Sequence, residues 1–503
     1  MTERVEVAVI GAGFAGLGMA MALRRAGRDS FVVLERAASV GGTWRDNTYP
    51  GVACDVPSHL YGFAAHPNPD WSGVYARGDE IHRYLEDVAD REHLGERLRL
   101  QTSLRSARWE DGVWRLETGG AEPGELHADV LVLACGRLTE PVVPEIDGLA
   151  GFDGPLFHSS RWDHSVDLEG ARVAVVGTGA SAIQLVPELA RTAAHVTLFQ
   201  RTPAWIVPRG ARPYSEAERA AFTAHPEELD RLRAELYTEG EARFASRSGD
   251  AAASVIARRT AEQHLAGQIG DPALRAALTP DYAFGCKRVL LSDEFYPAVA
   301  SDAVTLEPSA LAAVEGSALV ASSGARYDAD VLVLATGFAS TQQPYAALVH
   351  GEDGRTLDQH WAEGMTSFGS TVVTGFPNLF VLNGPNASLG HNSSVLMVEE
   401  QAAYTVRALA LRGEDRAVLR VRPEAEAAYS AEIARAARET PWMTGGCRNW
   451  YVDERSGRLT LLWPGTVDAF RARLARADGS EFAAATVSGT LHDGTSTRTG
   501  EQT

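Results

Sequence analysis

The chain has 503 residues and a formal net charge of −19, with 45% hydrophobic and 22% charged residues. This length exceeds what one hydrophobic core usually supports, so we expect two or three domains of an ordinary globular protein. The negative charge argues against nucleic acid or an anionic membrane surface as the main partner, because both attract basic patches. A small organic molecule is the better candidate.

The apolar runs and the cysteines add negative predictions. The first strand begins at about Val5, which leaves no room for a signal peptide, and no apolar run approaches the roughly 20 residues that span a bilayer. We therefore expect a cytoplasmic protein without stable membrane association. The cysteines lie far apart, with no C-x-x-C and no metal-ligand spacing, at Cys54, Cys135, Cys286 and Cys447. We expect all of them to be reduced packing residues, and we expect no metal site.

Residues 5–35 predict a strand, a glycine-rich turn, a helix and a second strand. The turn carries Gly11, Gly13 and Gly16 in the spacing G-x-G-x-x-G. Glycines at these positions let the backbone approach a pyrophosphate at the N-terminus of the helix. Glu35 ends the second strand, where a carboxylate accepts hydrogen bonds from a ribose diol. This unit therefore predicts a site for a dinucleotide with a free 2′-hydroxyl, such as FAD.

A second glycine-rich segment, residues 41–55, follows that strand. Its pattern is G-G-x-W-x4-Y-P-G-x3-D, with Gly42, Thr43 and Trp44 at the start and Asp55 at the end. Glycines allow a backbone to pack closely on a flat ring system, and a tryptophan can form an aromatic wall beside it. An isolated Asp55 would be interpreted as a turn or cap residue, so its functional interpretation depends on the motif around it.

Residues 171–202 repeat the order of strand, glycine turn, helix and strand. The turn and the start of the helix include Gly177, Thr178, Gly179, Ser181 and Ala182. The second strand of this unit is followed by Arg201 and Thr202, where the first unit has a glutamate. A carboxylate would repel a 2′-phosphate, whereas a guanidinium and a hydroxyl can bind one. The second unit therefore predicts an NADPH site. The alternative for either unit is a glycine turn that only joins a strand to a helix.

The remaining segments indicate how the two units are connected. Residues 129–136 and 330–338 are typical of buried parallel strands that end in glycine turns. Residues 213–278 are rich in Ala, Arg and Glu and predict helices, which either wall a site or form a solvated appendage. The composition of residues 478–503, rich in Gly, Ser, Thr and Asp, predicts a flexible tail.

Lysine is almost absent from the chain. Of the 47 basic residues only Lys287 is a lysine, and Arg288 follows it directly. A lone lysine suits a place where a compact charge must reach a phosphate, because arginine and lysine are not interchangeable there. The alternative is that one lysine has survived by chance at the solvated start of a strand.

Residues 152–163 carry the pattern F-x-G-x-x-x-H-x-x-x-W-D between the two glycine turns. This stretch resembles the fingerprint of type I Baeyer-Villiger monooxygenases, class B flavoenzymes that use NADPH and O2 to insert an oxygen atom beside a ketone carbonyl. Related flavin monooxygenases that oxidise nitrogen or sulfur usually carry Tyr or Phe and no Asp at the end, so Trp162 and Asp163 favour ketone oxidation. The resemblance extends over nearly the whole chain apart from the tail.

The resemblance implies an α/β fold with two dinucleotide-binding, Rossmann-like domains. The NADPH domain, residues 156–334 with a helical insertion at about 213–278, is expected to be inserted into a discontinuous FAD domain. The two parts of that FAD domain are residues 1–155 and 335–477. The expected substrates are a small ketone and O2, the expected product is an ester or a lactone, and the chain is expected to be a monomer or a homodimer.

The resemblance also implies a catalytic pair. Arg288 is the expected catalytic cation, which favours the anionic C4a-peroxide of the flavin and then the oxyanion formed on attack at the ketone. Asp55 is expected to orient the guanidinium without transferring a proton. By the same resemblance, Lys287 joins Arg201 and Thr202 around the 2′-phosphate of NADPH.

Other residues are implied as contacts of the two nucleotides. To the first glycine turn and Glu35, the FAD set adds Gly42, Thr43, Trp44, Asp55, Tyr61 and Leu104. To the second glycine turn, the NADPH set adds Arg201, Thr202, Lys287, Arg288 and Trp450. Trp450 is equally typical of a core residue. For His158 no proton-transfer role can be derived, and we expect it to tie the segment between the domains by hydrogen bonds.

Two other kinds of enzyme fit the same motifs. One is a flavin monooxygenase that forms N-oxides or sulfoxides, and the other is a flavin-dependent reductase or NADPH oxidase with idle oxygen chemistry. A non-catalytic binding module has little use for two dinucleotide sites with Arg288 and Asp55 between them. We therefore expect an FAD- and NADPH-dependent Baeyer-Villiger monooxygenase.

Overall fold

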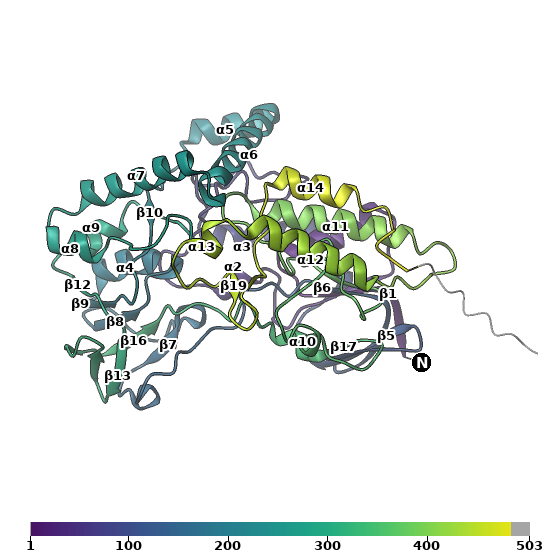
Figure 1. Ribbon diagram of the computed structural model, residues 1–503, viewed down its shortest axis with the longest axis horizontal. Helices are drawn as coiled ribbons and strands as arrows, with labels where there is room; N and C mark the ends of the chain where they lie inside the picture. Colours follow the sequence, from purple (N-terminus) through teal and green to yellow (C-terminus); the bar gives the residue numbers. More distant parts are fainter. Residues whose placement is uncertain (1, 484–503) are drawn as a thin grey trace, which may run out of the picture.

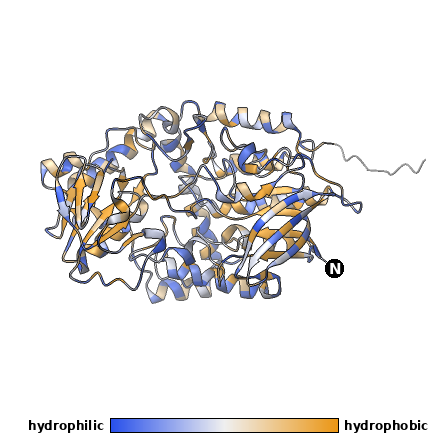
Figure 2. Ribbon diagram, turned by 90° about the horizontal axis from the view of Figure 1, so that it is seen from below, coloured by the Kyte–Doolittle hydropathy of each residue, from blue (hydrophilic) through white to orange (hydrophobic). Residues whose placement is uncertain are grey.

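The computed structural model describes residues 2–483 of the chain. Two sheets stand at opposite ends of an elongated molecule (Figure 1). Apolar residues concentrate in the strands of both sheets, as the hydropathy colouring shows (Figure 2). The sheets do not share one continuous core, because their buried residues fall into separate hydrophobic clusters.

The first sheet consists of β1 (Glu3–Ile10), β2 (Phe31–Leu34), β3 (Leu98–Arg99), β4 (Thr102–Glu110), β5 (Val113–Gly120), β6 (Gly124–Leu133), β17 (Val349–His350) and β18 (Leu379–Val381). The strand order is β17-β4-β5-β6-β1-β2-β3, with β18 paired to β6. β1 runs parallel to β2 and β6, and its residues Val7, Ala8 and Val9 are fully buried. A continuous apolar run of this kind is typical of a parallel strand covered on both faces. Helix α1 (Phe14–Arg25) follows β1 and packs against α11 (Ser394–Ala410).

The second sheet consists of β7 (Leu156–His158), β8 (Arg172–Val176), β9 (His195–Phe199), β12 (Val304–Glu307) and β16 (Val331–Leu334). Its order is β12-β9-β8-β16-β7 and all its pairs are parallel. Helices α4 (Ala180–Thr192) and α9 (Phe295–Val299) pack together beside it, and β13 (Leu311–Glu315), β14 (Ala318–Ala321) and β15 (Arg326–Asp328) form a small antiparallel sheet. The chain leaves the first sheet after β6 and returns to it with β17, so the second unit is inserted into the first, in agreement with the expected fold class.

The helical insertion consists of α5 (Glu216–Ala224), α6 (Pro226–Ser248), α7 (Ala251–Gln268) and α8 (Pro272–Ala277), along the upper edge in Figure 1. Helix α6 is fixed to the first unit, because Arg233 donates hydrogen bonds to the carbonyl oxygens of His59 and Gly62 at 2.9 and 3.1 Å. The Asn392 side chain donates to the carbonyl oxygen of Tyr237 on the same helix at 3.2 Å. The insertion is therefore packed against loops of the first unit and is not a solvated appendage.

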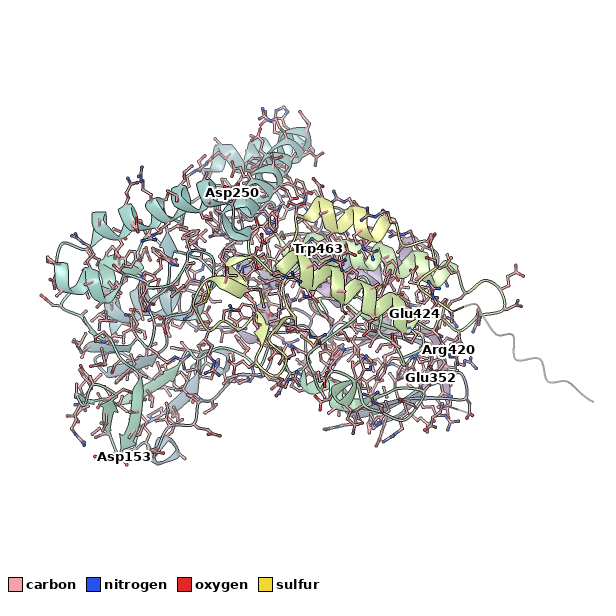
Figure 3. All side chains as sticks on the ribbon, in the orientation of Figure 1. Asp153, Asp250, Glu352, Arg420, Glu424 and Trp463 are labelled. Carbon is pink, nitrogen blue, oxygen red and sulfur yellow. A yellow bond between two sulfur atoms is a disulfide. The ribbon has the colours of Figure 1, made fainter. Side chains whose placement is uncertain are left out.

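The segment after α11 first passes the edge of the first sheet, where Leu419 exchanges hydrogen bonds with Asn378 just before β18, and then runs toward the middle of the molecule. It contains α12 (Pro423–Ala437), α13 (Pro441–Thr444), β19 (Val452–Asp453), β20 (Arg458–Leu459) and α14 (Val467–Ala475), while α10 (Leu357–His360) precedes α11. Arg420 donates to Glu352 at 2.8 Å and ties this segment to the loop after β17 (Figure 3). Within residues 2–483, no helix is long and apolar enough to cross a membrane.

The prediction of a flexible tail from residue 478 is wrong for its first residues. Glu481 and Phe482 are buried, and Tyr404 donates a hydrogen bond to Glu481 at 2.8 Å. A polar composition misses this anchor because one buried ring and one paired carboxylate are enough to fix a short segment. Residues 484–503, the rest of that prediction, lie outside the described part of the chain.

Candidate functional site

The first glycine turn joins β1 to α1 and has a backbone that side chains would block. Gly11 has a φ of +103°, and a Cβ there would lie 2.6 Å from the carbonyl oxygen of Ala134. A Cβ on Gly16 would lie 1.8 Å from the carbonyl oxygen of Gly11, whereas one on Gly13 would meet only Gly42, at 3.6 Å. The turn is therefore packed tightly against the protein at Gly11 and Gly16 but leaves space beside Gly13. This arrangement fits a pyrophosphate at the N-terminus of α1.

Glu35 lies directly beside this turn. Its carboxylate accepts hydrogen bonds from the backbone N–H groups of Ala12 at 2.9 Å and Ala37 at 3.0 Å, and Arg45 pairs with it at 3.2 Å. The backbone N–H of Thr102 donates to the Glu35 carbonyl oxygen at 2.8 Å, which places the start of β4 against the same strand end. These contacts fix the carboxylate at the rim of the turn, and Leu104 lies buried two residues further along β4.

An aromatic wall stands at the start of α1. The Trp44 indole N–H donates to the Tyr61 hydroxyl at 3.2 Å, and the ring of Phe14 lies 5.0 Å from the ring of Tyr61. Gly42 comes just before the short helix α2 (Thr43–Asp46), which carries Thr43 and Trp44. Burial raises the pKa of Tyr61, so its phenol stays neutral. The structure thus brings the predicted residues of the 41–55 motif to the first glycine turn.

The second glycine turn repeats the backbone of the first. Gly177 has a φ of +114°, and a Cβ there would lie 2.5 Å from the carbonyl oxygen of Ala335. The Thr178 hydroxyl donates to the carbonyl oxygen of Thr202 at 2.9 Å, which joins the turn to the end of β9. Gly179 has nothing within 4 Å of an added Cβ. Ser181 and Ala182 lie in the first turn of α4.

A cleft of about 530 Å³ opens beside this second turn. Its lining includes Arg201, Thr202, Lys287, Cys447 and Arg448. Burial lowers the pKa of Lys287 and the nearby Arg201 lowers it further, which shows that the two cations face the same space. The predicted phosphate-binding residues therefore meet. Sequence reasoning missed Arg448, because within its segment only Trp450 was singled out as an NADPH contact.

Arg288 and Asp55 form an ion pair between the two turns. Arg288 Nε and Nη2 donate to the same oxygen, Asp55 Oδ2, at 2.9 and 2.6 Å. The negative charge of Asp55 raises the pKa of Arg288, although burial opposes the shift. The two residues are 233 positions apart in the chain and both side chains are partly exposed. The pair therefore holds one guanidinium permanently charged and fixed in orientation.

Tyr451 is a further residue at this pair that sequence reasoning missed. Burial raises its pKa to about 12, while the neighbouring guanidinium groups of Arg288 and Arg247 act to lower it. The predicted residue Trp450 is partly buried, and its ring lies 4.7 Å from that of Tyr451. The aromatic ring beside Arg288 is thus that of Tyr451, the residue after Trp450, and the expected contact of Trp450 with the nicotinamide stays a prediction. Tyr451 could have been found from the sequence, because it directly follows Trp450, an aromatic residue already predicted at the site.

The prediction that all four cysteines are reduced is wrong for two of them. Cys286 and Cys447 form a disulfide, with their Cα atoms 6.2 Å apart. Only Cys54 and Cys135 are free. The partners are 161 residues apart, so no spacing pattern could reveal them. The bond joins the residue before Lys287 to the segment that carries Arg448, Trp450 and Tyr451.

The residues of the 152–163 pattern lie where the chain enters the second unit. His158 is buried, and its Nδ1 accepts a hydrogen bond from the backbone N–H of Ser160 at 3.1 Å. Burial lowers its pKa to about 4, so the ring is neutral near pH 7. A Cβ on Gly154 would lie 2.1 Å from the carbonyl oxygen of Asp330, and the ring of Trp162 packs on Phe157 at 5.0 Å. These contacts fix the entry segment by packing and hydrogen bonds.

Two nucleotide turns, one beside a buried carboxylate and one beside a cationic cleft, define an oxidoreductase with two dinucleotide sites. Residues 8–214 match the family described as pyridine nucleotide-disulphide oxidoreductase. The chain is 46% identical over 485 residues to a Baeyer-Villiger monooxygenase of Streptomyces coelicolor, which covers 95% of this chain and 92% of the relative. The chain therefore belongs to the Baeyer-Villiger monooxygenase family.

Solved structures agree with this assignment. The oxidized steroid monooxygenase bound to NADP matches with a TM-score of 0.83 at 31% identity, over 95% of this chain and 99% of that chain. OTEMO in complex with FAD and NADP matches with a TM-score of 0.84 at 26% identity, over 96% of this chain and 100% of that chain. The α/β fold class with two Rossmann-like domains is thereby confirmed.

Proposed function

We propose that the protein converts a ketone into an ester or a lactone by inserting one oxygen atom of O2 next to the carbonyl, with FAD as the bound cofactor and NADPH as the reductant. The observation that carries this proposal is the Arg288–Asp55 pair, placed between a turn that fits FAD and a cleft that fits NADPH. Membership of the Baeyer-Villiger family favours ketone oxidation over N- or S-oxidation.

Bound FAD, once reduced by NADPH, would supply the activated oxygen. The contribution of the protein is a fixed positive charge. Because the pKa of Arg288 is raised, its guanidinium stays protonated at every relevant pH, and it stabilises negative charge as this develops on the ketone oxygen. Asp55 accepts both hydrogen bonds on one oxygen and so orients the guanidinium; it has no proton to give. Tyr451, neutral and buried, excludes water on one side of the pair.

The cofactor residues divide between the two turns. For FAD we propose contacts with the first glycine turn and with Glu35, Gly42, Thr43, Trp44, Tyr61 and Leu104. For NADPH we propose that Arg201, Thr202 and Lys287 bind the 2′-phosphate, because they line one cleft. Trp450 is proposed at the nicotinamide end. Domain boundaries at 155/156 and 334/335 are supported by β7, which begins at Leu156, and by β16, which ends at Leu334.

We also propose the cytoplasm as the location, because the reaction consumes NADPH. Disulfides are rare in reducing compartments, so the ratio of bonded to reduced Cys286 and Cys447 in the cell tests this location, and a fully bonded pair would contradict it. Blocking thiols with an alkylating reagent in rapidly quenched cells, followed by mass spectrometry, measures that ratio.

Substitution of Arg288 tests the proposed function. Arg288→Ala should keep FAD and still be reduced by NADPH, but ester formation should fall by about a thousandfold, as expected for loss of a charge that stabilises an oxyanion. Product analysis by gas chromatography and NADPH consumption in the same assay separate the two effects. Arg326→Ala, which removes an exposed arginine paired with Glu315, is the matched control and should behave as the unaltered enzyme. Ester formation retained by Arg288→Ala would refute the assignment.

A further inference from the structure

Arg247 is a second guanidinium near the reaction centre, partly exposed as a residue but with two buried nitrogens. It lies in the last turn of α6, just before Asp250, whose side chain caps α7 (Figure 3). Its Nε and Nη1 atoms are inaccessible and lack a hydrogen-bond partner among residues 2–483. Among residues 2–483, no other arginine has two buried side-chain nitrogens without a hydrogen-bond partner. The protein therefore leaves two nitrogens of this guanidinium unsatisfied.

The surroundings of Arg247 place it beside the catalytic segment. Its Cζ lies 5.0 Å from the centre of the Phe284 ring, and a Cβ on Gly285 would lie 3.6 Å from the Arg247 Cα. Phe284 and Gly285 precede Arg288 by only a few residues, so α6 packs directly on the strand start that carries the catalytic cation. The insertion thus forms one wall of the reaction centre.

The charges that face Arg247 contain no counter-ion. The titratable groups that act on its pKa are Tyr451, Arg288 and Arg243, and none of them is a carboxylate. Burial lowers the pKa of Arg247 to about 10, which still leaves the guanidinium charged near pH 7. An uncompensated buried charge is strongly destabilising. The C-terminal end of α6 and the ring of Phe284 offset only part of that cost, because both are weak partners compared with an anion.

Arg233 on the same helix shows what a purely structural arginine looks like here. It donates to two backbone carbonyl oxygens, those of His59 and Gly62, at 2.9 and 3.1 Å. Arg247, on the same helix, makes no such bond with its Nε or Nη1 atoms. Its missing partner is not the 2′-phosphate of the coenzyme, because Arg201, Thr202 and Lys287 line a different cleft, to which Arg247 does not contribute.

We propose that Arg247 binds a carboxylate of the substrate, so that the enzyme selects ketones that carry a carboxylate at a distance from the carbonyl. A carboxylate would neutralise this charge and accept charge-assisted hydrogen bonds from a guanidinium whose donors the protein leaves unsatisfied. With Arg288 at the ketone oxygen and Arg247 at the carboxylate, the two cations fix both ends of a keto acid. This inference rests on the proposed function, and it assigns Arg247 to specificity, not to the oxygen insertion.

The first test compares linear keto acids of increasing chain length with their methyl esters, using the holoenzyme and NADPH. The unaltered enzyme should show a kcat/KM about tenfold or more higher for the acid of best length than for its ester. Arg247→Met should lose that preference, with the KM for NADPH unchanged, and Arg247→Lys should keep part of it. Arg231→Met, which changes an exposed arginine of the same helix that lies 4.0 Å from Glu235, is the control and should keep the preference in full.

The second test measures binding without turnover. A saturated aliphatic carboxylate and its primary amide are titrated into the NADP⁺-bound holoenzyme, and the flavin absorbance reports binding. The carboxylate should bind the unaltered protein and not Arg247→Met, while the amide should bind both weakly. Carboxylate binding that depends on Arg247 would support the inference even if the enzyme oxidised no ketone. In that case only the proposed function would be refuted.

Three results would overturn the inference. They are an equal kcat/KM for acids and esters in the unaltered enzyme, an acid preference that survives in Arg247→Met, or an effect of that variant on the KM for NADPH alone. If Arg247→Met loses FAD or unfolds, the comparison of Arg247→Lys with the unaltered enzyme decides: an unchanged acid-to-ester ratio refutes the inference, and a reduced ratio with unchanged NADPH binding supports it.

Discussion

The two nucleotide turns share a backbone but differ in their surroundings. Gly11 and Gly177 both have a positive φ, and both sit against the carbonyl oxygen of an alanine that ends a neighbouring strand. Beyond the turn the resemblance stops. Glu35 is only 5% exposed and bonded on both oxygens, whereas Arg201 is exposed on an open cleft. The first site is enclosed and the second is accessible.

The difference matches two ways of using a nucleotide. An enclosed site suits a cofactor that stays bound through many turnovers, while an open one suits a coenzyme that must enter as NADPH. The walls differ in origin as well. The residues named at the first site all lie within the first 135 residues, whereas part of the second cleft comes from residues 446–448, far along the chain. The surroundings of each turn, and not its backbone, therefore distinguish the two sites.

The same substitution in both turns should have unequal consequences. Gly11→Ala forces a Cβ to within 2.6 Å of the Ala134 carbonyl oxygen, so the purified protein should contain almost no FAD. Gly177→Ala makes an equivalent clash, with the Ala335 carbonyl oxygen at 2.5 Å, but should retain FAD and raise the KM for NADPH by about tenfold or more. Flavin absorbance per protein and steady-state kinetics measure the two effects.

Gly170→Ala is the control for this pair. It also has a positive φ, of +69°, but an added Cβ would meet nothing within 4 Å, so backbone strain is tested without a clash. Its flavin content and its KM for NADPH should stay near those of the unaltered enzyme. If Gly11→Ala kept its flavin, the enclosed description of the first site would be wrong.

Removal of the disulfide should affect only the second site. The bond closes a loop with a separation of 161 residues, so Cys286→Ser is expected to lower the free energy of unfolding under oxidising conditions by about 2–4 kcal/mol. Because Cys447 lines the NADPH cleft, the KM for NADPH should rise a few-fold while FAD content stays unchanged. Denaturant unfolding with and without a thiol reductant measures the first effect.

Cys135→Ala is the matched control, since Cys135 is free and lies away from that cleft. A thiol reductant should lower the stability of the unaltered enzyme and of Cys135→Ala to that of Cys286→Ser, and it should leave Cys286→Ser unchanged. Equal stability of all three proteins without reductant would show that the bond contributes nothing.

Local patterns predicted the parts of the molecule that are built from neighbouring residues. Each glycine turn, together with the strand before it and the helix and strand after it, occupies about thirty consecutive residues, and periodicity predicts such units directly. Asp55 and Arg288 were different, because their pairing crosses 233 positions and followed only from a family resemblance. The fold brings them together, and no property of either local segment requires it.

The missed features share that long-range origin. The Cys286–Cys447 bond and the nearness of Arg247 to Arg288 each depend on how the helical insertion and the C-terminal segment pack. A buried arginine without a partner cannot be recognised in a sequence, because composition treats it as a surface charge. The prediction of a flexible tail failed for residues 478–483 for a similar reason, since the buried ring of Phe482 fixes this segment despite its polar composition.

Arg201 gives the finest test of the contrast between the two sites. Arg201→Ala should lower kcat/KM for NADPH by about ten- to a hundredfold, the range for a lost charged hydrogen bond, and should leave kcat/KM for NADH nearly unchanged. The reason is that NADH has no 2′-phosphate for the guanidinium to bind. Arg191→Ala, an exposed arginine on α4 that pairs with Glu188 and does not line the cleft, is the control. Steady-state rates with both coenzymes measure the effect. An equal loss of kcat/KM with NADPH and NADH would mean that Arg201 stabilises the cleft and does not bind the 2′-phosphate. The complementary exchange, Glu35→Arg in the enclosed site, should abolish FAD binding, because a buried cation would replace the carboxylate that the Ala12 and Ala37 N–H groups require.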